Sequence, residues 1–425
     1  MSYLTYIPAV GTSDLDNGTP VEELKKVFGY NQNFLDKDKS SYYYPQMLIS
    51  YYYGRKYKDL RGEAGLSPEI KIKGDSGGFQ NITQDANLDP LDVITWQQKN
   101  CDTGLILDCP PFKKIEGSAQ FGETTPEVFT EALNKTIVNA KVALDNWTNP
   151  DFTLMGVIQG DTVNRQEEWT EAMLQVEKDK GREFAGWSLS PKPSHDIKQI
   201  ATHAANLIDR GMTDKPIHIL QISGFESLAM SCYVAKFFKS TVTVDSSTAT
   251  VGRQYFTYFD PYEFKNNWDF GARNTVKLKT LACDCPVCNK IEHKHLTYDE
   301  WDTRSPPGFL ITLHNLYQII KYVKYLNAIR DDEEIFRKFC FKHFGQKFLN
   351  VMDYIDEVAK FGKQESYRKN VIKSQKLTNF FNQESGAEEV DQKALVEEKL
   401  EMLRKEFPGV KDSSLKVIAE HRGLL

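Results

Sequence analysis

The sequence predicts an α/β fold, a (β/α)8 TIM barrel with a zinc-binding insertion and a helical C-terminal extension. Two observations favour this class. Short apolar runs alternate with helix-like stretches from the N-terminus to about residue 250, and polar residues or glycines stand where the runs end. Alternating strands and helices indicate βαβ units and a parallel sheet. Eight such units, the number found here, form a closed barrel.

The predicted strands are apolar runs that are too short for core helices. In chain order they span residues 3–10, 46–53, 69–75, 103–109, 153–160, 184–190, 217–223 and 241–247. Helix-like stretches between them span residues 125–147, 164–181, 194–211 and 225–239. An open, doubly wound parallel sheet shows the same alternation and is the alternative fold.

Functional residues are expected where these strands end. Their ends carry polar groups or glycine, namely Asp75, Asp108, Gln159, Gly224 and Asp245, while Gly186 and Trp187 lie in the sixth strand. In a parallel barrel the carboxyl ends of all strands converge on one face, around a ligand. Aspartate and glycine are also common in turns, so any one of these residues has a structural explanation. Two aspartates, a glutamine and several glycines on one rim favour a site.

Composition limits the classes of function. The chain has 425 residues, of which 40% are hydrophobic, and a formal net charge of −6. A polyanion would therefore need a local basic patch. No apolar run is long enough to span a membrane, and the N-terminus lacks the pattern of a signal peptide. Seven cysteines, three of them close together, favour a metal in a reducing compartment over disulfides. We expect a cytoplasmic protein, in the host cytoplasm if its origin is viral.

The alternation of strands and helices stops near residue 260, which suggests three regions. We assign residues 1–330 to the barrel, including a zinc subdomain at about 265–318. Residues 331–380 form a helical basic extension, and residues 381–425 a linker and a short helical tail. Lysines and arginines outnumber acidic residues in 265–330 and again in 360–376. These segments either contact a nucleic-acid backbone or form a solvated face.

The segment CDCPVC predicts a metal centre. Cys283, Cys285 and Cys288 lie within six residues, and His314 opens a helical run further along the chain. Three thiolates and one imidazole make a closed tetrahedral Zn²⁺ site, which is structural because no position remains for water. His293 and His295 are rival ligands that spacing does not exclude, and unligated reduced cysteines are the alternative.

Taken together, several segments resemble the tRNA-guanine transglycosylase superfamily over roughly residues 70–330. They are DSGGFQ (75–80), DCPP (108–111), VIQGD (157–161), CDCPVC (283–288) with His314, and HNLY (314–317). Members of this superfamily are (β/α)8 barrels with a structural zinc, and they exchange guanine in a nucleic acid for a 7-deazaguanine. The resemblance implies that Asp245 is the nucleophile and Asp75 the general acid and base. It implies a base pocket formed by Phe79, Gln80, Asp108, Gln159, Gly186, Trp187 and Gly224.

The same residues suit the chemistry on physical grounds. Cleavage of a glycosidic bond builds positive charge on the sugar, which a carboxylate opposite the base stabilises or captures. A second carboxylate must exchange protons with the base, so the two need different protonation behaviour. An aromatic such as Phe79 can hold a base that has left its stack. Gly77 and Gly78 allow the backbone to approach a flat ring.

Departures from the pattern of transfer-RNA members point to the DNA-modifying branch. The segment after the expected nucleophile reads DSSTATVGR (245–253) in place of a Pro-Thr-Arg segment, and Gln221 and Ile222 replace a methionine–glycine pair. This branch inserts 7-cyano-7-deazaguanine or a derivative into DNA, often in bacteriophages. The expected partners are DNA and a free 7-deazaguanine base, with no membrane. A tRNA-modifying enzyme, a non-catalytic nucleic-acid-binding subunit and an unrelated barrel hydrolase are the alternatives. The sequence leaves a homodimer or accessory modification proteins open.

Overall fold

The computed structural model describes most of the chain. The described residues are 3–11, 15, 34–38, 40, 42–113, 122–191, 196–222, 224–254, 258–259, 266–267, 283, 285–286, 288, 306–362, 401 and 404. The chain divides into two compact units, residues 1–362 and 363–425. The first unit therefore extends past residue 330, where the sequence analysis ended the barrel. The linker and tail expected at 381–425 lie almost wholly outside the described residues.

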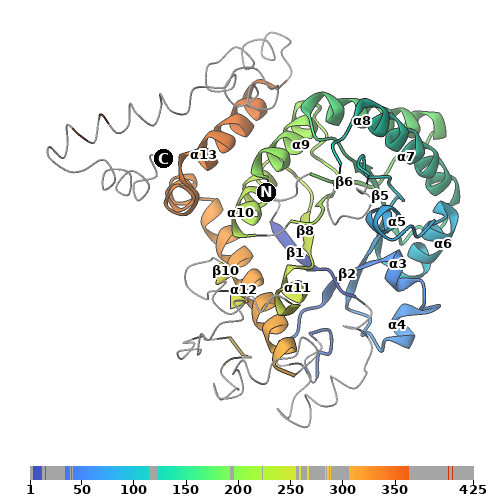
Figure 1. Cartoon of the computed structure of the whole chain (residues 1–425), viewed down its shortest axis with the longest axis horizontal. Helices are drawn as coiled ribbons and strands as arrows, with labels where there is room; N and C mark the ends of the chain where they lie inside the picture. Colours follow the sequence, from blue (N-terminus) through green and yellow to red (C-terminus); the bar gives the residue numbers. More distant parts are fainter. Residues whose placement is uncertain are drawn as a thin grey trace. The chain divides into compact units, whose positions relative to one another are not determined.

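Eight parallel strands form a nearly closed barrel (Figure 1). They are β1 (Leu4–Pro8), β2 (Gln46–Ser50), β3 (Lys71–Asp75), β4 (Thr103–Leu105), β5 (Thr153–Ile158), β6 (Gly186–Leu189), β7 (Ile217–Ile219) and β8 (Val242–Ser246). Strand β1 pairs with β8, and β2 through β8 pair in sequence order. A parallel bridge between Ala9 and Leu48 joins β1 to β2. The predicted (β/α)8 barrel is confirmed, including its first two strands.

Helices follow the strands and cover the barrel (Figure 1). They are α3 (Tyr51–Gly54), α4 (Leu60–Glu63), α5 (Gly78–Thr83), α6 (Pro90–Asn100), α7 (Pro126–Asn146), α8 (Val163–Lys180), α9 (Ile197–Asp209), α10 (Phe225–Ala235), α11 (Thr248–Gln254), α12 (Pro306–Arg330) and α13 (Glu333–Phe361). A two-stranded antiparallel pair, β9 (Tyr258–Phe259) and β10 (Asn266–Asn267), lies between α11 and α12 in the chain. Helix α12 packs along α10 and α11, and α13 packs on α9. No described helix has the length and apolarity that a membrane span requires.

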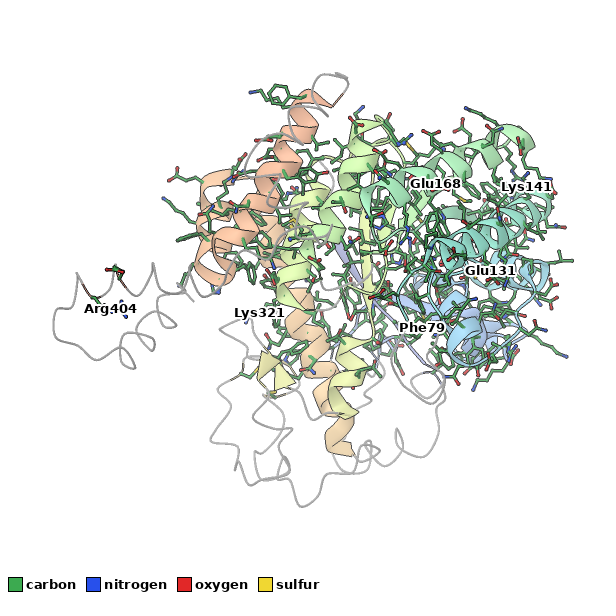
Figure 2. The ribbon with its side chains drawn as sticks, turned by 45° about the horizontal axis from the view of Figure 1, so that its top comes forward. Phe79, Glu131, Lys141, Glu168, Lys321 and Arg404 are labelled. Carbon is green, nitrogen blue, oxygen red and sulfur yellow. The ribbon has the colours of Figure 1, made fainter. Side chains whose placement is uncertain are left out.

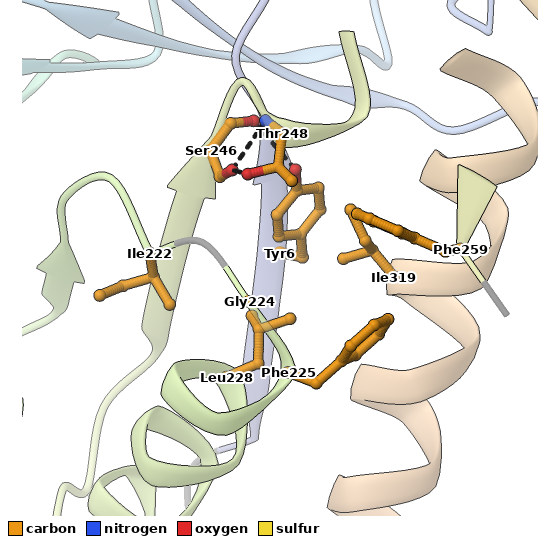
Figure 3. Close-up of a pocket in the computed structure, with 9 residues that line it drawn as sticks. All are labelled: Tyr6, Ile222, Gly224, Phe225, Leu228, Ser246, Thr248, Phe259 and Ile319. Carbon is orange, nitrogen blue, oxygen red and sulfur yellow. Dashed lines mark hydrogen bonds between the residues drawn. The ribbon is translucent and has the colours of Figure 1, made fainter. Parts of the chain in front are cut away.

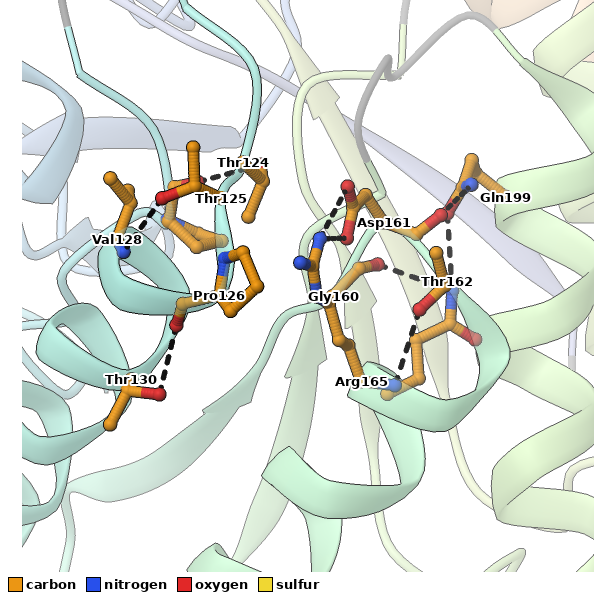
Figure 4. Close-up of polar contacts among 12 residues, drawn as sticks. Thr124, Thr125, Pro126, Val128, Thr130, Gly160, Asp161, Thr162, Arg165 and Gln199 are labelled. Atoms are coloured by element: carbon orange, nitrogen blue, oxygen red, sulfur yellow. Dashed lines mark hydrogen bonds and ion pairs between the residues drawn. The ribbon is translucent and has the colours of Figure 1, made fainter. Parts of the chain in front are cut away.

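Side-chain caps fix where several of these helices begin. Thr125 accepts a hydrogen bond from the Val128 amide at the start of α7, and Thr162 accepts one from the Arg165 amide at the start of α8 (Figure 4). Such caps satisfy amides that have no partner inside the helix. Because α8 starts soon after β5 ends, its cap also fixes the loop that ends that strand.

The register shows which strand residues face the barrel interior. Ser188 pairs with His218, and His218 pairs with Thr243, so these three side chains point to the same side. Trp187, one residue earlier, points to the opposite side, where its ring packs against Phe184 with centroids 5.5 Å apart. The shell between strands and helices thus takes the large aromatic residues, and the interior takes a mixture of polar and apolar groups.

Candidate active site and metal centre

Four of the predicted site residues meet at the carboxyl-terminal rim of the barrel. Asp75 is the last residue of β3, Asp108 follows β4, Gln159 follows β5, and Asp245 lies near the end of β8. Asp108 and Asp245 both raise the pKa of Asp75 by electrostatic repulsion, so their charges act on that carboxyl. The sequence prediction that strand ends place these groups together therefore holds for the described rim.

The surroundings of Asp75 favour the protonated form of its carboxyl group. Burial, followed by the charges of Asp108 and Asp245, raises the pKa of Asp75 to about 7. Hydrogen bonds from Ser50 and from the Gly77 amide, the latter 3.2 Å long, oppose the shift. A carboxyl group with a pKa near 7 can both donate and accept a proton at neutral pH, as a general acid and base must. Among the described rim groups, Asp75 is therefore the one suited to proton exchange at neutral pH.

Asp245 is held differently, as a nearly inaccessible carboxylate with hydrogen-bonding neighbours. Only 4% of Asp245 is exposed. Its Oδ1 accepts a hydrogen bond of 2.9 Å from the backbone amide of Gln221, and His218 Nε2 lies 3.3 Å from the same oxygen. Gln221 has a φ of 59°, a left-handed conformation that is uncommon outside glycine and that points to a constrained loop. The loop after β7 thus orients the carboxylate of β8.

The neighbours of Asp245 include two groups that the sequence analysis missed. Burial, together with the charge of Lys73, lowers the pKa of His218 to about 4, so its imidazole is neutral at pH 7. Burial also lowers the pKa of Lys73 to about 8, while the charge of Asp245 opposes that shift. The period-two pattern of a strand could have indicated Lys73, which lies two residues before Asp75 and faces the same side. His218 carries no such signal, because a single histidine in an apolar strand is most often a core residue.

Asp108 and Gln159 form one hydrogen-bonded unit. Ser76 Oγ donates to Asp108 Oδ1 at 2.9 Å, and Gln159 Nε2 donates to Asp108 Oδ2. Gln159 is fully buried, and its Oε1 has no hydrogen-bond partner among the described residues. Buried acceptors almost always have a donor. The pair therefore offers an unused acceptor to a donor such as the N–H of a ligand.

Helices α8 and α9 hold the loop that carries Gln159. The carbonyl oxygen of Gly160 accepts hydrogen bonds from Gln166 Nε2 at 3.2 Å and is 3.1 Å from His203 Nε2. Gly160 has a φ of 131°, and a Cβ there would lie 2.6 Å from the Gln166 backbone nitrogen. Figure 4 shows the adjoining contacts, in which Gln199 bonds the carbonyl of Asp161. Any side chain larger than glycine at position 160 would clash with the backbone of α8 beside the Gln159 loop.

Phe79 and Gln80 lie on α5, directly after the Asp75 strand. Figure 2 shows Phe79 close to the barrel, whereas Glu131, Lys141 and Glu168 lie on the outer helices. The Phe79 ring meets the Phe112 ring edge to face, with centroids 6.1 Å apart. Gln80 Oε1 accepts a hydrogen bond of 3.2 Å from Ser50, the residue paired with Asp75. Two half-buried side chains thus border the carboxylates, one of them aromatic.

The glycine turn before α5 brings that helix against Asp108. Gly77 has a φ of 85°, a left-handed conformation that glycine adopts without strain. A Cβ on Gly78 would lie 2.4 Å from the carbonyl oxygen of Asp108 and 2.5 Å from its Oδ1. Only glycine fits such an approach. The DSGGFQ segment therefore owes its two glycines to the contact between β3, β4 and α5.

The structure does not bring Gly186 and Trp187 to the rim. They begin β6, at the amino-terminal end of the barrel, and the Trp187 ring lies outside the barrel wall. A Cβ on Gly186 would lie 2.7 Å from the Pro216 carbonyl, so this glycine serves close packing. Ser190, which is 5% exposed, occupies the carboxyl end of β6 in their place. The apolar run 184–190 predicts a strand that contains Gly186 and Trp187, but it does not give the exact bounds that single out Ser190.

Gly224 lies beside the barrel at a small apolar pocket (Figure 3). It precedes α10 with a φ of 92°. Tyr6 Oη donates a 2.9 Å hydrogen bond to the Ser246 carbonyl at one side of the pocket, and Phe225 and Ile319 line the other side. The pocket volume of about 10 Å³ is enough for one water molecule. A purine does not fit there in this conformation.

The predicted metal ligands converge at one point. Cys283, Cys285, Cys288 and His314 place their ligand atoms within 4.8 Å of one another, and all four residues are buried. The three Sγ atoms lie 3.5, 3.4 and 3.3 Å from His314 Nδ1. Sulfur and nitrogen ligands of a tetrahedral Zn²⁺ are about 3.6 Å apart. The group therefore fits zinc, and the rival ligands His293 and His295 lie outside the described residues.

Neighbouring groups orient these ligands as a metal centre requires. His314 Nε2 lies 2.8 Å from the Phe259 carbonyl, which fixes Nδ1 as the metal-facing nitrogen. The side-chain amide of Gln318 donates to Cys283 Sγ at 3.3 Å, and the backbone amide of Cys288 donates to Cys285 Sγ at 3.2 Å. Donors of this kind stabilise thiolates. Since four ligands close a tetrahedron, the centre can join β9 to α12 but offers no position for catalysis.

In comparisons with known proteins, no family model and no curated protein matches the chain. The chemistry of the site must therefore be inferred from its residues. The rim holds a carboxyl with a pKa near 7, a buried carboxylate, an unused amide acceptor and an aromatic ring. This combination suits cleavage of a bond in which the leaving group is protonated while a carboxylate stabilises the positive charge that develops on the other fragment.

Proposed function

We propose that the protein is a guanine transglycosylase that exchanges guanine in DNA for a 7-deazaguanine, 7-cyano-7-deazaguanine or a derivative. The observation that carries the proposal is the pair Asp75 and Asp245 at one rim. The pKa of Asp75 is raised to about 7, and Asp245 lies as a buried carboxylate beside a neutral histidine. This difference is what base exchange needs, and it supports the roles implied by the sequence resemblance.

The proposed reaction has two halves. In the first, an Asp245 carboxylate oxygen attacks C1′ of the target nucleotide, the bond from C1′ to the guanine nitrogen breaks, and Asp75 protonates that nitrogen. In the second, the 7-deazaguanine enters and loses its N–H proton to Asp75. Its nitrogen then attacks C1′ and releases the Asp245 carboxylate. Bonds and protons balance over the cycle, so no oxidant, reductant or water is consumed.

Recognition of the base falls to Asp108, Gln159 and Phe79. A guanine-type ring presents N–H donors on one edge, which match the Asp108 carboxylate and the unused Gln159 Oε1. Phe79, supported edge to face by Phe112, supplies a ring face for a base that has left its stack. The same edge is present in guanine and in 7-deazaguanine, so one pocket serves both halves of the reaction.

The cysteine–histidine centre would hold a structural Zn²⁺. Cys283, Cys285, Cys288 and His314 supply a complete ligand set, and none of them comes from the rim strands. Bound zinc would supply folding free energy to the segment that joins β9 to α12. The proposed exchange uses only the rim residues.

The choice of DNA over tRNA depends on the segment after Asp245. Ser246 Oγ accepts a hydrogen bond of 2.8 Å from the Thr248 amide, so the chain turns at once into α11. The sequence at this turn differs from the Pro-Thr-Arg segment with which transfer-RNA members read neighbouring bases. The side chain of Arg253 and the basic segment 363–376 lie outside the described residues.

The proposal is tested by offering labelled guanine or 7-cyano-7-deazaguanine with duplex DNA, single-stranded DNA or bulk tRNA in separate reactions. We expect label in DNA from the wild type and from Asp179→Asn, a surface aspartate on α8 that is the matched control. Asp245→Asn should incorporate none. Label in tRNA alone would assign the enzyme to tRNA modification. No label in any reaction, with either base, would contradict the proposal.

A further inference from the structure

The barrel has a cavity at the end opposite the carboxylates, lined by both polar and apolar residues. Its volume is about 260 Å³. The residues that line it stand at the amino-terminal ends of the strands, including Gln46, Lys71, Thr103, Thr153 and Thr241. Barrel interiors are normally filled by side chains, and this end normally serves stability. A cavity of this size at the amino-terminal end therefore needs an explanation of its own.

Lys73 is the deepest charged group of this cavity. Only 8% of it is exposed, and Met155 Sδ, 3.5 Å from its Nζ, is the one hydrogen-bonding contact of the ammonium among the described residues. No described carboxylate lies within ion-pair distance of it. Buried charges are normally paired, because desolvation of an isolated ammonium is costly. The lowered pKa of Lys73, about 8, reflects that cost.

The acidic residue at the cavity wall is already neutralised. Asp102 Oδ2 accepts hydrogen bonds from Arg61 at 2.9 Å and from the Ile72 amide at 2.7 Å, and Lys71 Nζ lies 3.8 Å from its other oxygen. Its charge is therefore not available to Lys73. With Lys71 and Lys73 both lining the cavity, its wall carries a net positive charge.

Hydroxyl and amide groups complete a polar lining. Thr103, Thr153 and Gln46 line the cavity, and no side-chain hydrogen bond involves them within the described part of the chain. Unused donors around an unpaired ammonium are the arrangement that binds a small oxyanion. An apolar ligand would leave these donors unsatisfied, and a cation would be repelled by the ammonium.

We propose that the amino-terminal end of the barrel is a binding site for a small anion, whose phosphate, sulfate or carboxylate group pairs with Lys73 and accepts from the threonine hydroxyls. The cavity opens at the end of the barrel opposite the proposed exchange reaction, although the charge of Lys73 also acts on His218 and is influenced by that of Asp245. Its occupant supplies a counter-charge at ion-pair distance, which Asp245, acting on Lys73 from further away, does not provide. The volume also accommodates an organic part beyond the anionic group.

Calorimetric titration of the full-length protein with sodium sulfate tests this site. We expect saturable binding at one site per chain, weakened about tenfold or more in Lys73→Met, which keeps the length of the side chain but removes its charge. Thr153→Val should weaken binding less. Lys338→Met, on the exposed face of α13, is the matched control and should bind as the wild type does.

Two results would overturn the proposal. Absence of saturable sulfate binding to the wild type would mean that the cavity holds only water. Binding that survives Lys73→Met unchanged would place the anion elsewhere. If Lys73→Met does not fold, Thr153→Val decides, since it removes one hydroxyl and conserves volume. Unchanged affinity in that variant would also contradict the site.

Discussion

The rim carboxylates and the cysteine–histidine centre are both assembled from residues far apart in the chain, but they are held in opposite ways. At the rim, burial and the like charges of Asp108 and Asp245 raise the pKa of Asp75 to about 7. At the centre, three thiols and one imidazole converge on a point suited to a cation. The rim holds a buried carboxyl away from its ordinary pKa, which costs stability, whereas a bound metal would stabilise the centre. Mutations in the two regions should therefore have opposite consequences.

The largest expected effect is on activity at the rim. Asp245→Asn removes the proposed nucleophile but keeps the shape of the side chain and the Gln221 contact. We expect base exchange to fall about 10³-fold or more, with thermal stability unchanged or slightly raised. Initial exchange rates and a melting curve measured on the same preparation check this. Normal exchange by the variant would remove Asp245 from the mechanism.

Cys285→Ser should do the reverse. Loss of one thiolate opens the ligand set, and because the free energy of metal binding is also free energy of folding, we expect several kcal/mol of destabilisation. Metal content by elemental analysis and unfolding by denaturant check the effect. Cys101→Ser, at a buried cysteine outside the centre, is the control for loss of a thiol. Full stability of Cys285→Ser without metal would refute a structural zinc.

A smaller and pH-dependent effect is expected for Asp75→Asn. Because the folded-state pKa of Asp75 is raised, from 3.8 to about 7, the folded protein binds more protons than the unfolded chain between those values. Stability of the wild type therefore falls as pH rises from about 4 to 7. The variant lacks this penalty.

We expect Asp75→Asn to match the wild type near pH 4 and to be more stable by about 1–3 kcal/mol above pH 7. Urea unfolding at several pH values measures the difference. Asp179→Asn should show no such window. A variant that is less stable than the wild type at pH 8 would mean that the Asp75 carboxylate is stabilised in the fold, contrary to this account.

The smallest effect concerns the support of the metal ligands. Gln318→Leu removes the amide that donates to Cys283 Sγ and leaves the four ligands in place. Loss of such a partner typically weakens metal affinity about 10- to 100-fold. Competition with a chelator measures it, and Gln346→Leu on α13 is the control. Unchanged affinity would show that Gln318 only fills space.

The order of strands, the rim aspartates and the metal ligands could all be predicted from the sequence. Each has a local signal, such as an apolar run, a polar strand end or closely spaced cysteines. The positions of His218, Lys73 and Gln221 beside Asp245 could not be predicted, because they depend on contacts across strands. Nor could the sequence show that Trp187 faces outward and that Gly186 begins its strand. The exact strand bounds decide which residue of a run reaches the rim. An apolar run does not reveal those bounds.

The central claim is that Asp245 forms a bond to the sugar. The most direct measurement is to incubate protein with a DNA duplex and free 7-cyano-7-deazaguanine, denature the mixture and examine it by gel and by intact mass. We predict a protein–DNA adduct in the wild type, mapped to Asp245 after digestion, and none in Asp245→Asn. Base exchange that proceeds without any adduct, or an adduct on another residue, would contradict the account.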